Sequence, residues 1–318
     1  MYPLKSTFIF LIALISTFII TKYFIKKFNE KGFTVKDMYK PEKPQVPTMG
    51  GLAILSGTLV ALICSQILLP ELQIDKLLVF YFVVFIYGIF GLIDDLIDIN
   101  RTMKLFLPFF LALPIAILNI DTTLDFFTIH IELGWIFSYI LAPMYVMVVA
   151  NLINMHSGYN GLSGGLATIL LIFVGIESYF KNPNTPFFFY LMPILGAMLA
   201  FMWFNKYPSK IFLGNSGTLL IGAAVGGAII LNNLEIFGVF ILIPHIINFL
   251  MWIYWLMNMH IYPHVKFAKV QLDGTIKPPN RLTLKYLLAH YFKVGELRSI
   301  LILYGITTIF GLLGLILL

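Results

Sequence analysis

The sequence predicts an all-α integral membrane protein, a single polytopic domain over residues 1–318 with about ten transmembrane helices. The first observation is composition: the 318 residues are 59% hydrophobic and only 11% charged, and the mean hydropathy is +0.91. A water-soluble chain of this length does not need so much apolar side-chain area. The second observation is that apolar residues form continuous runs of roughly 20 residues, the length that crosses about 30 Å of hydrocarbon. Continuous rather than alternating runs also argue against a β-barrel.

Ten such runs follow one another, separated by short polar joints, and each is expected to be one helix. In chain order they cover residues 4–23, 51–69, 77–93, 105–118, 135–150, 162–180, 187–204, 211–231, 236–257 and 297–317. The first run ends in Lys22, Lys26 and Lys27 without a small-residue cleavage site, which predicts a retained helix rather than a signal peptide. The fourth run is short and contains Pro108 and Pro114, so its ends are the hardest to place.

Lysine and arginine are concentrated in alternate connections. Of the 21 basic residues, 18 lie in the connections 22–50, 94–104, 151–161, 205–210 and 258–298. Because cytoplasmic segments retain positive charge, we expect a multi-pass protein of the cell membrane with this side in the cytoplasm and both termini outside. The basic pI, near 9.2, then reflects topology and an anionic ligand, and gives no reason to expect nucleic acid.

Asp94, Asp95 and Asp98 form the sharpest polar grouping, directly after the third run. Three carboxylates at a helix C-terminus oppose the helix dipole and one another. Lys104, Arg101 or a hard divalent cation such as Mg²⁺ could offset them. A solvated helix end is the simpler alternative, but adjacent aspartates at a bilayer boundary are costly, which favours a functional site.

Two further groupings are rich in glycine and asparagine. In residues 151–165, asparagine amides offer oxygen to a metal and glycines allow a ligand to approach the backbone, although an ordinary turn explains the pattern equally well. Residues 214–218 begin the eighth run, where free amides at a helix N-terminus favour an anion. The later glycines of that run, Gly222, Gly226 and Gly227, are expected only to pack helices against each other.

The connection 258–296, between the ninth and tenth runs, is basic and contains several prolines. It is too long for a simple connector between membrane helices. We therefore expect it to be a cytoplasmic substrate-binding loop.

These groupings, in this order, resemble the polyprenyl-phosphate N-acetylhexosamine-1-phosphate transferase family, in particular its archaeal and eukaryotic UDP-GlcNAc:dolichyl-phosphate GlcNAc-1-phosphate transferases. The resemblance covers about residues 32–292 and rests on the segments PTMGGLAILSG, DDLIDINRTMKLFLP, NLINMHSGYNG, YPSKIFLGNSGT and IPHIINFL. It implies transfer of GlcNAc-1-phosphate from UDP-GlcNAc to dolichyl or another polyprenyl phosphate, with release of UMP. The active site would lie at the cytoplasmic face and use Mg²⁺, with Mn²⁺ as the alternative. Membrane lipid is the expected surrounding, and a homodimer is compatible with the family.

Carried over position by position, the resemblance implies roles for individual residues. Asp94 and Asp95 would be the essential paired acids, and Lys104 would contact phosphate. Asn154 would bind Mg²⁺, together with Asn215, which stands where the family usually has aspartate. The expected nucleotide and sugar contacts are Lys36, Asp37, Met38, Thr48, Gly158, Asn160, Phe212, His264 and Lys266. Among these, Gly158 and Asn160 would meet the uracil and Phe212 would stack on it.

Several alternatives stay open from the sequence. Asp94 and Asp95 could act as base or as metal ligands, and a neutral Asn215 is a weaker Mg²⁺ ligand than a carboxylate. The segment HVKFAK replaces the arginine-rich cluster of the eukaryotic branch, so the sugar is open, and the histidine triplet of the bacterial muramoyl-pentapeptide branch is absent. The same reaction with another UDP-HexNAc or with undecaprenyl phosphate, for cell-wall polymers, is the nearest alternative. A secondary transporter is more remote, since it would place its site near the midplane and usually contain internal repeats.

Overall fold

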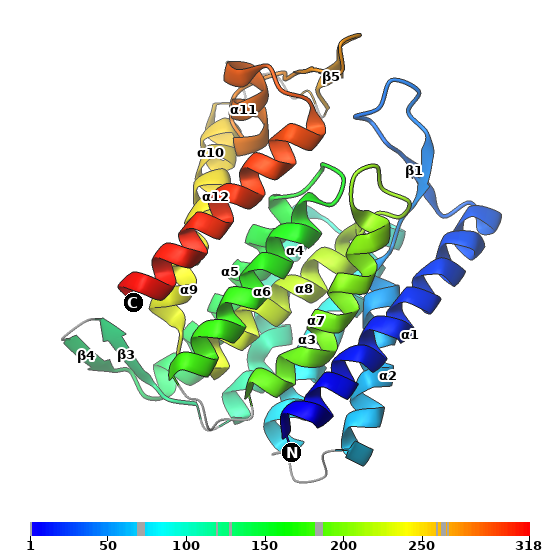
Figure 1. Ribbon diagram of the computed structural model, residues 1–318. Coiled ribbons are helices and arrows are strands. Elements are labelled where there is room, and N and C mark those ends of the chain that lie inside the picture. Colours follow the sequence, from blue (N-terminus) through cyan, green and yellow to red (C-terminus); the bar gives the residue numbers. More distant parts are fainter. Residues whose placement is uncertain are drawn as a thin grey trace.

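The computed structural model describes residues 2–68, 74–118, 120–126, 129–181, 187–258, 260–261, 265 and 267–318. The chain forms a bundle of long, tilted helices with three short antiparallel strand pairs in its connections (Figure 1). The helices are α1 Tyr2–Lys31, α2 Gly51–Leu68, α3 Ile74–Ile97, α4 Arg101–Ala112, η1 Leu113–Ile117, η2 Phe137–Leu141, α5 Ala142–Met155, α6 Leu162–Lys181, α7 Phe187–Asn205, α8 Gly214–Leu231, α9 Glu235–Ile241, α10 Ile243–Met257, α11 Leu284–Phe292 and α12 Glu296–Leu317. The strands are β1 Thr34–Lys36, β2 Gln45–Pro47, β3 Thr123–Phe126, β4 Ile129–Glu132, β5 Lys269–Val270 and β6 Ile276–Lys277.

The predicted membrane class is confirmed, but the number of spans is not. Each of the ten predicted runs is helical over most of its described length. Six helices in the described part of the chain are long and apolar enough to cross a membrane, and α9 with α10 makes a seventh if that bent pair is one span. Helices α2 and α7 are apolar but shorter. Helix length by itself therefore identifies six or seven spans in the described part of the chain.

Prolines explain where the predicted runs break, because proline has no N–H and cannot continue the hydrogen-bond ladder of a helix. The fourth run changes from α4 to the 3-10 helix η1 at Pro114. Pro143 cannot donate to the carbonyl group one turn earlier, and that turn, η2, has the wider π form. Helices α9 and α10 meet at an angle of 64° beside Pro244.

Helix α8 forms the centre of the bundle. Its residues 216–230 are all buried, and it packs against α2, α3, α5 and α6. The predicted packing role of its glycines is confirmed by the approach of α5: a Cβ atom added at Gly222 would lie 2.6 Å from the Cα atom of Ala150. We expect a side chain there to cost about 1–3 kcal/mol through overpacking.

The hairpin of β1 and β2 fixes the segment in front of α8. The two strands pair antiparallel, with Val35 opposite Val46. Immediately after β2, the carbonyl oxygen of Pro47 accepts a hydrogen bond from Phe212 N at 2.7 Å, and Gly50 N donates to Phe212 O at 2.9 Å. The N-terminal hairpin and the entry to α8 are thus one hydrogen-bonded unit, which the sequence did not predict.

The two ends of the bundle differ in what they carry. Figure 1 shows both termini and the β3–β4 hairpin at one end, and the β1–β2 hairpin, β5 and α11 at the other. The sequence predicted both termini on one side of the membrane. The connections at the opposite end supply most of the polar groupings described above.

Candidate active site

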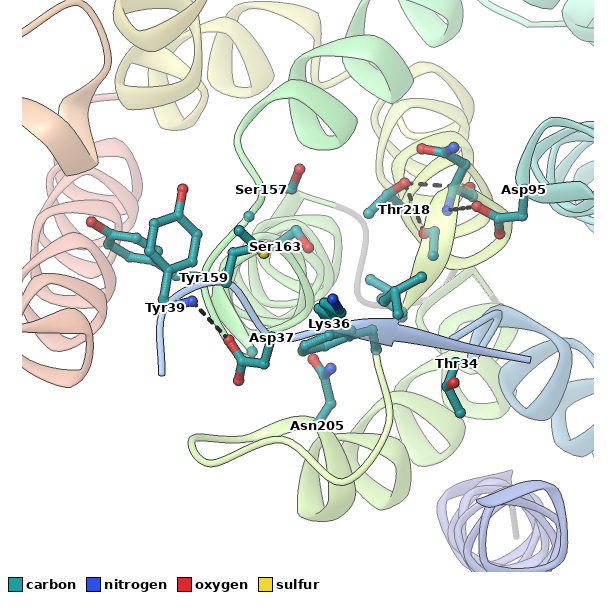
Figure 2. A pocket seen from close by; sticks show the side chains of 18 of the residues that line it. Thr34, Lys36, Asp37, Tyr39, Asp95, Ser157, Tyr159, Ser163, Asn205 and Thr218 are labelled. Atoms are coloured by element: carbon teal, nitrogen blue, oxygen red, sulfur yellow. Dashed lines mark hydrogen bonds between the residues drawn. The ribbon is translucent and has the colours of Figure 1, made fainter. Parts of the chain in front are cut away.

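A cavity of about 690 Å³ lies among the connections at the end of the bundle that carries β1–β2 and α11. Residues from 34–45, 154–163 and 205–218 line it, together with Asp95 and Phe267. Figure 2 shows Asp95 and Thr218 on one side of the cavity, Asp37, Tyr39 and Tyr159 on the other, and Lys36 between them. We call these sides the Asp95 end and the Asp37 end. The volume falls in the range of small-molecule sites, about 300–1,000 Å³.

Most of the residues predicted for the site line this cavity. They are Lys36, Asp37, Met38, Asp95, Asn154, Gly158, Phe212 and Asn215. Four other predicted residues lie outside its wall, namely Thr48, Asp94, Lys104 and Asn160. The predicted contacts His264 and Lys266 lie outside the described residues.

Asp95 joins the end of α3 to the start of α8. One carboxylate oxygen accepts a hydrogen bond from Asn215 N at 2.8 Å, and the other accepts from Ser216 N at 3.0 Å. Backbone N–H groups at a helix N-terminus favour an anion, as the sequence predicted for this segment. The anion that binds there is a side chain of the protein itself, which leaves Asp95 half-buried and facing the cavity.

Oxygen atoms from three further residues gather at the Asp95 end. The hydroxyl group of Thr218 donates to Oδ1 of Asn154 at 2.7 Å, and the adjacent Asn215 also lines the cavity. Among the described residues, no three His, Cys, Asp or Glu side chains are grouped so that they could hold a metal ion. One carboxylate with neutral oxygens still fits Mg²⁺, which keeps several waters and often binds one or two carboxylates plus substrate phosphates.

Asp94 turns away from the cavity, toward α4. Its carboxylate lies 2.8 Å from Lys104 Nζ and accepts a hydrogen bond from Ile99 N at 2.9 Å. Asp98 lies 2.9 Å from the same ammonium group, although α3 has already ended and the backbone of Asp98 is left-handed. Lys104 is thus the cation that offsets two of the three aspartates, while backbone N–H groups at the start of α8 hold the third, Asp95. Burial lowers the pKa of Lys104, but its hydrogen bonds to the two aspartates outweigh this and leave the pKa raised.

At the Asp37 end, buried polar side chains hold three connections and the start of α12 together. Asp37 accepts hydrogen bonds from Tyr39 N at 3.2 Å and from the amide group of Asn160 at 3.1 Å. Glu296, at the start of α12, accepts from the backbone and the amide group of Asn160 at 2.6 and 2.8 Å, and pairs with Lys40. Ser209 N donates to the amide oxygen of Asn160. The amide of Asn160 is therefore engaged with protein partners behind the cavity wall.

Comparison with known proteins identifies the family. The model of glycosyl transferase family 4 matches residues 77–233. A Methanocaldococcus jannaschii protein named as a glycosyltransferase is 30% identical over 238 residues, which are 75% of this chain and 72% of that protein. The chain belongs to glycosyl transferase family 4. The family resemblance seen in the sequence is thereby confirmed.

Two other relatives of this family 4 transferase differ in how much of the chain they cover. A Sulfolobus acidocaldarius protein, assigned by name as a UDP-N-acetylglucosamine–dolichyl-phosphate N-acetylglucosaminephosphotransferase, is 29% identical over 320 residues, 96% of this chain and 94% of that protein. A phospho-N-acetylmuramoyl-pentapeptide-transferase from a Wolbachia of Brugia malayi is 29% identical over 252 residues, 72% of this chain and 76% of that protein. Nearly the whole chain thus matches the first relative.

The site of this family 4 transferase also contains residues that the sequence did not single out. Tyr39 and Tyr159 adjoin predicted residues, so their positions gave a signal that could have been used. Thr218 lies in the segment that the sequence did favour. Glu296 and Lys285 gave no such signal, because their partners lie far away in the sequence: Glu296 binds Asn160, behind the cavity wall, and Lys285 binds Ser157, which lines it.

Proposed function

We propose that this protein transfers N-acetylglucosamine-1-phosphate from UDP-N-acetylglucosamine to a polyprenyl phosphate such as dolichyl phosphate and releases UMP. The product would be the first lipid-linked intermediate of glycan assembly, and of N-glycan assembly in particular. The S. acidocaldarius relative assigned by name to this reaction supports the proposal, because the alignment covers 96% of this chain.

The observation that carries the proposal is the composition of a single cavity. The oxygen donors of the Asp95 end share it with Lys36, Asp37, Gly158 and Phe212, the positions at which the family resemblance expects the nucleotide. A site for a nucleoside diphosphate sugar needs one end that binds the base and another that binds the phosphates. The length of the cavity from Asp37 to Asp95 offers one of each.

In the proposed reaction an oxygen of the polyprenyl phosphate attacks the β-phosphorus of the UDP-sugar. The bond from the β-phosphorus to the oxygen it shares with the α-phosphorus breaks, and that oxygen leaves with UMP. A phosphate monoester is largely ionised near pH 7, since its second pKa is about 6, so no general base is required. Positioning and charge neutralisation are what phosphoryl transfer needs from the protein.

The residues of this chain would divide that work. Lys104, which Asp94 and Asp98 hold in place, supplies a fixed positive charge for the acceptor phosphate. Asp95, Asn154 and Asn215 would hold Mg²⁺ together with oxygens of the diphosphate. When bound, the ion would neutralise charge on the diphosphate. Asp95 then serves as a metal ligand and Asp94 as the partner of Lys104.

We also propose that all ten helical runs lie in the membrane and that the cavity faces the cytoplasm. The distribution of positive charge supports this orientation, because 18 of the 21 basic residues lie in the connections of that side. Both termini would then lie outside, which agrees with their position at the other end of the bundle (Figure 1). The site would meet a soluble nucleotide sugar and a lipid phosphate at the same interface.

The nearest competing function is the transfer of another UDP-HexNAc, or transfer to undecaprenyl phosphate, for cell-wall polymers. The Wolbachia relative favours it, but that alignment covers 72% of this chain, against 96% for the S. acidocaldarius protein. Transport is less well supported, because the cavity is formed by connections at one end of the bundle rather than by helices at its middle.

The deciding experiment measures UMP release from UDP-N-acetylglucosamine by the purified protein. Dolichyl phosphate and Mg²⁺ are both supplied, then each is omitted, then Mn²⁺ replaces Mg²⁺. Release that requires both acceptor and metal supports the proposal. Faster release with UDP-MurNAc-pentapeptide and undecaprenyl phosphate would establish the cell-wall reaction instead. Absence of UMP with every UDP-HexNAc and polyprenyl phosphate tested would overturn the transferase assignment.

A further inference from the structure

Lys285 is a half-buried lysine in the first turn of α11, on the long connection between α10 and α12. Its ammonium group donates a hydrogen bond to the carbonyl oxygen of Ser157 at 2.7 Å. It also lies 5.7, 5.0 and 5.3 Å from the ring centroids of Tyr39, Tyr159 and Tyr286. A cation within about 6 Å of an aromatic ring is attracted to the ring's face. Four contacts from three connections therefore hold this single ammonium group.

The three tyrosines are themselves held in place. The hydroxyl groups of Tyr39 and Tyr286 are hydrogen-bonded at 2.9 Å, and the rings of Tyr39 and Tyr159 meet edge to face with centroids 4.8 Å apart. Tyr39 and Tyr159 also line the cavity. Lys285 thus sits directly behind the wall of the Asp37 end.

Gly158 is shaped around this lysine. Its φ angle is +103°, a backbone conformation that L side chains rarely adopt, and a Cβ atom added there would collide with Lys285 Nζ. The Lys285 ammonium group therefore occupies the space that a side chain at position 158 would fill, and only glycine leaves that space free. If the amine is removed, Ser157 loses a charged hydrogen-bond donor and the turn loses its support.

We propose that Lys285 is a positioning residue for the nucleotide, which holds the Ser157–Gly158 turn in the form that lines the cavity. The proposal rests on the nucleotide-sugar function proposed above and adds a residue from the connection between α10 and α12 to it. The described part of this connection then has a clear role in the site: through Lys285, α11 supports the cavity wall at the Asp37 end from the side that faces away from the cavity.

The charge of Lys285 gives the proposal a pH signature. Burial lowers the pKa of its ammonium group to about 8, and Glu296 opposes this shift. The other titratable groups that face it are His156, Tyr39, Tyr159 and Tyr286. As the pH rises through about 8, the lysine loses its proton and with it the positive charge behind the nucleotide-binding turn. Arginine at this position would keep its charge throughout.

The test compares Lys285→Met, Lys285→Gln and Lys285→Arg with the wild type. Binding of UDP to the purified full-length protein and the KM and kcat for the UDP-sugar are measured from about pH 6.5 to about pH 9. Loss of a hydrogen bond to a charged group should weaken UDP binding and raise KM roughly tenfold in the Met and Gln variants, with a smaller change in kcat. The Arg variant should bind UDP more tightly than the Met and Gln variants. Its UDP affinity should not fall above about pH 8, whereas that of the wild type should.

Lys269→Met is the matched control, because Lys269 is exposed on β5 of the same connection. It removes the same charge and should leave UDP binding unchanged. Unchanged UDP affinity in both the Met and Gln variants would overturn the proposal, as would a lower Tm with a wild-type KM. If both variants fail to fold, the pH profiles of wild type and Lys285→Arg decide the matter, and identical profiles contradict it.

Failure of the proposed function is distinguishable from failure of this inference. A wild-type protein that binds UDP but releases no UMP would refute the transferase reaction, while weaker UDP binding in the lysine variants would still support the role of Lys285.

Discussion

The two ends of the cavity are built in different ways. The Asp95 end rests on the start of α8 and on the ends of α3 and α5, which both pack against α8 in the bundle core, and its carboxylate is held by two backbone N–H groups. The Asp37 end is made from connections, and its charged groups Asp37, Lys40 and Glu296 are turned toward each other. Rigid backbone thus supports one end and side-chain pairing supports the other.

This difference indicates which property of the enzyme, turnover or nucleotide affinity, each end of the cavity controls. At the Asp95 end, the charge faces the cavity, so a substitution changes the interactions available to the reacting phosphates. At the Asp37 end, each buried charge has a partner within the protein. Removing one member of a pair leaves the other charge buried and unpaired, which destabilises the fold. We expect changes at the first end to affect turnover, and changes at the second to affect nucleotide affinity and stability.

The largest expected effect is that of Asp95→Asn. Asparagine keeps one acceptor for the N-terminal amides of α8 but removes the only carboxylate among the residues that line the Asp95 end. We expect kcat to fall roughly 100-fold or more while the folded protein is retained. UMP release and the thermal transition are measured together. Asp121→Asn is the control, since Asp121 is exposed near the β3–β4 hairpin at the other end of the bundle; turnover retained in Asp95→Asn would refute the role assigned to Asp95.

An intermediate effect is expected from Glu296→Gln. The amide group would place a donor against Lys40 and remove a charged acceptor from Asn160. We expect a loss of about 1–3 kcal/mol in stability and a several-fold rise in the KM for the UDP-sugar, with little change in kcat. Thermal unfolding measures the change in stability, and initial rates measure the change in KM and kcat. The exposed Glu42 supplies the matched variant, Glu42→Gln. A selective loss of kcat in Glu296→Gln would show that the two ends are not separate in function.

The smallest effect is the pH dependence of stability due to Lys285. Its folded pKa of about 8 lies below the ordinary value of 10.5. The stability it contributes is therefore fully present above pH 10.5 and is lost as the pH falls through about 8. Relative to Lys285→Met, the wild type should gain about 1–2 kcal/mol between about pH 7.5 and about pH 9.5. Parallel Tm curves for the two proteins across this range would contradict the lowered pKa.

The sequence predicted much of the site because short segments carry its residues together. Lys36, Asp37 and Met38 are adjacent, and Gly158 and Asn215 lie in the groupings that the composition singled out. Sequence could not separate Asp94 from Asp95, which are neighbours on one helix but meet Lys104 and the start of α8 respectively. The proline breaks in the fourth, fifth and ninth runs were only partly foreseen, because composition registers apolar length and not a change of helix direction.

By itself, the sequence determined that this protein belongs in a membrane and which connections hold the polar groups, since hydropathy and charge are properties of local segments. Only the tertiary structure decided which polar groups face the cavity. Asn160 meets Glu296 across 136 positions, and Ser157 meets Lys285 across 128. Such pairs depend on how helices pack and on where a buried charge can find a partner. No pattern within a single segment records that geometry.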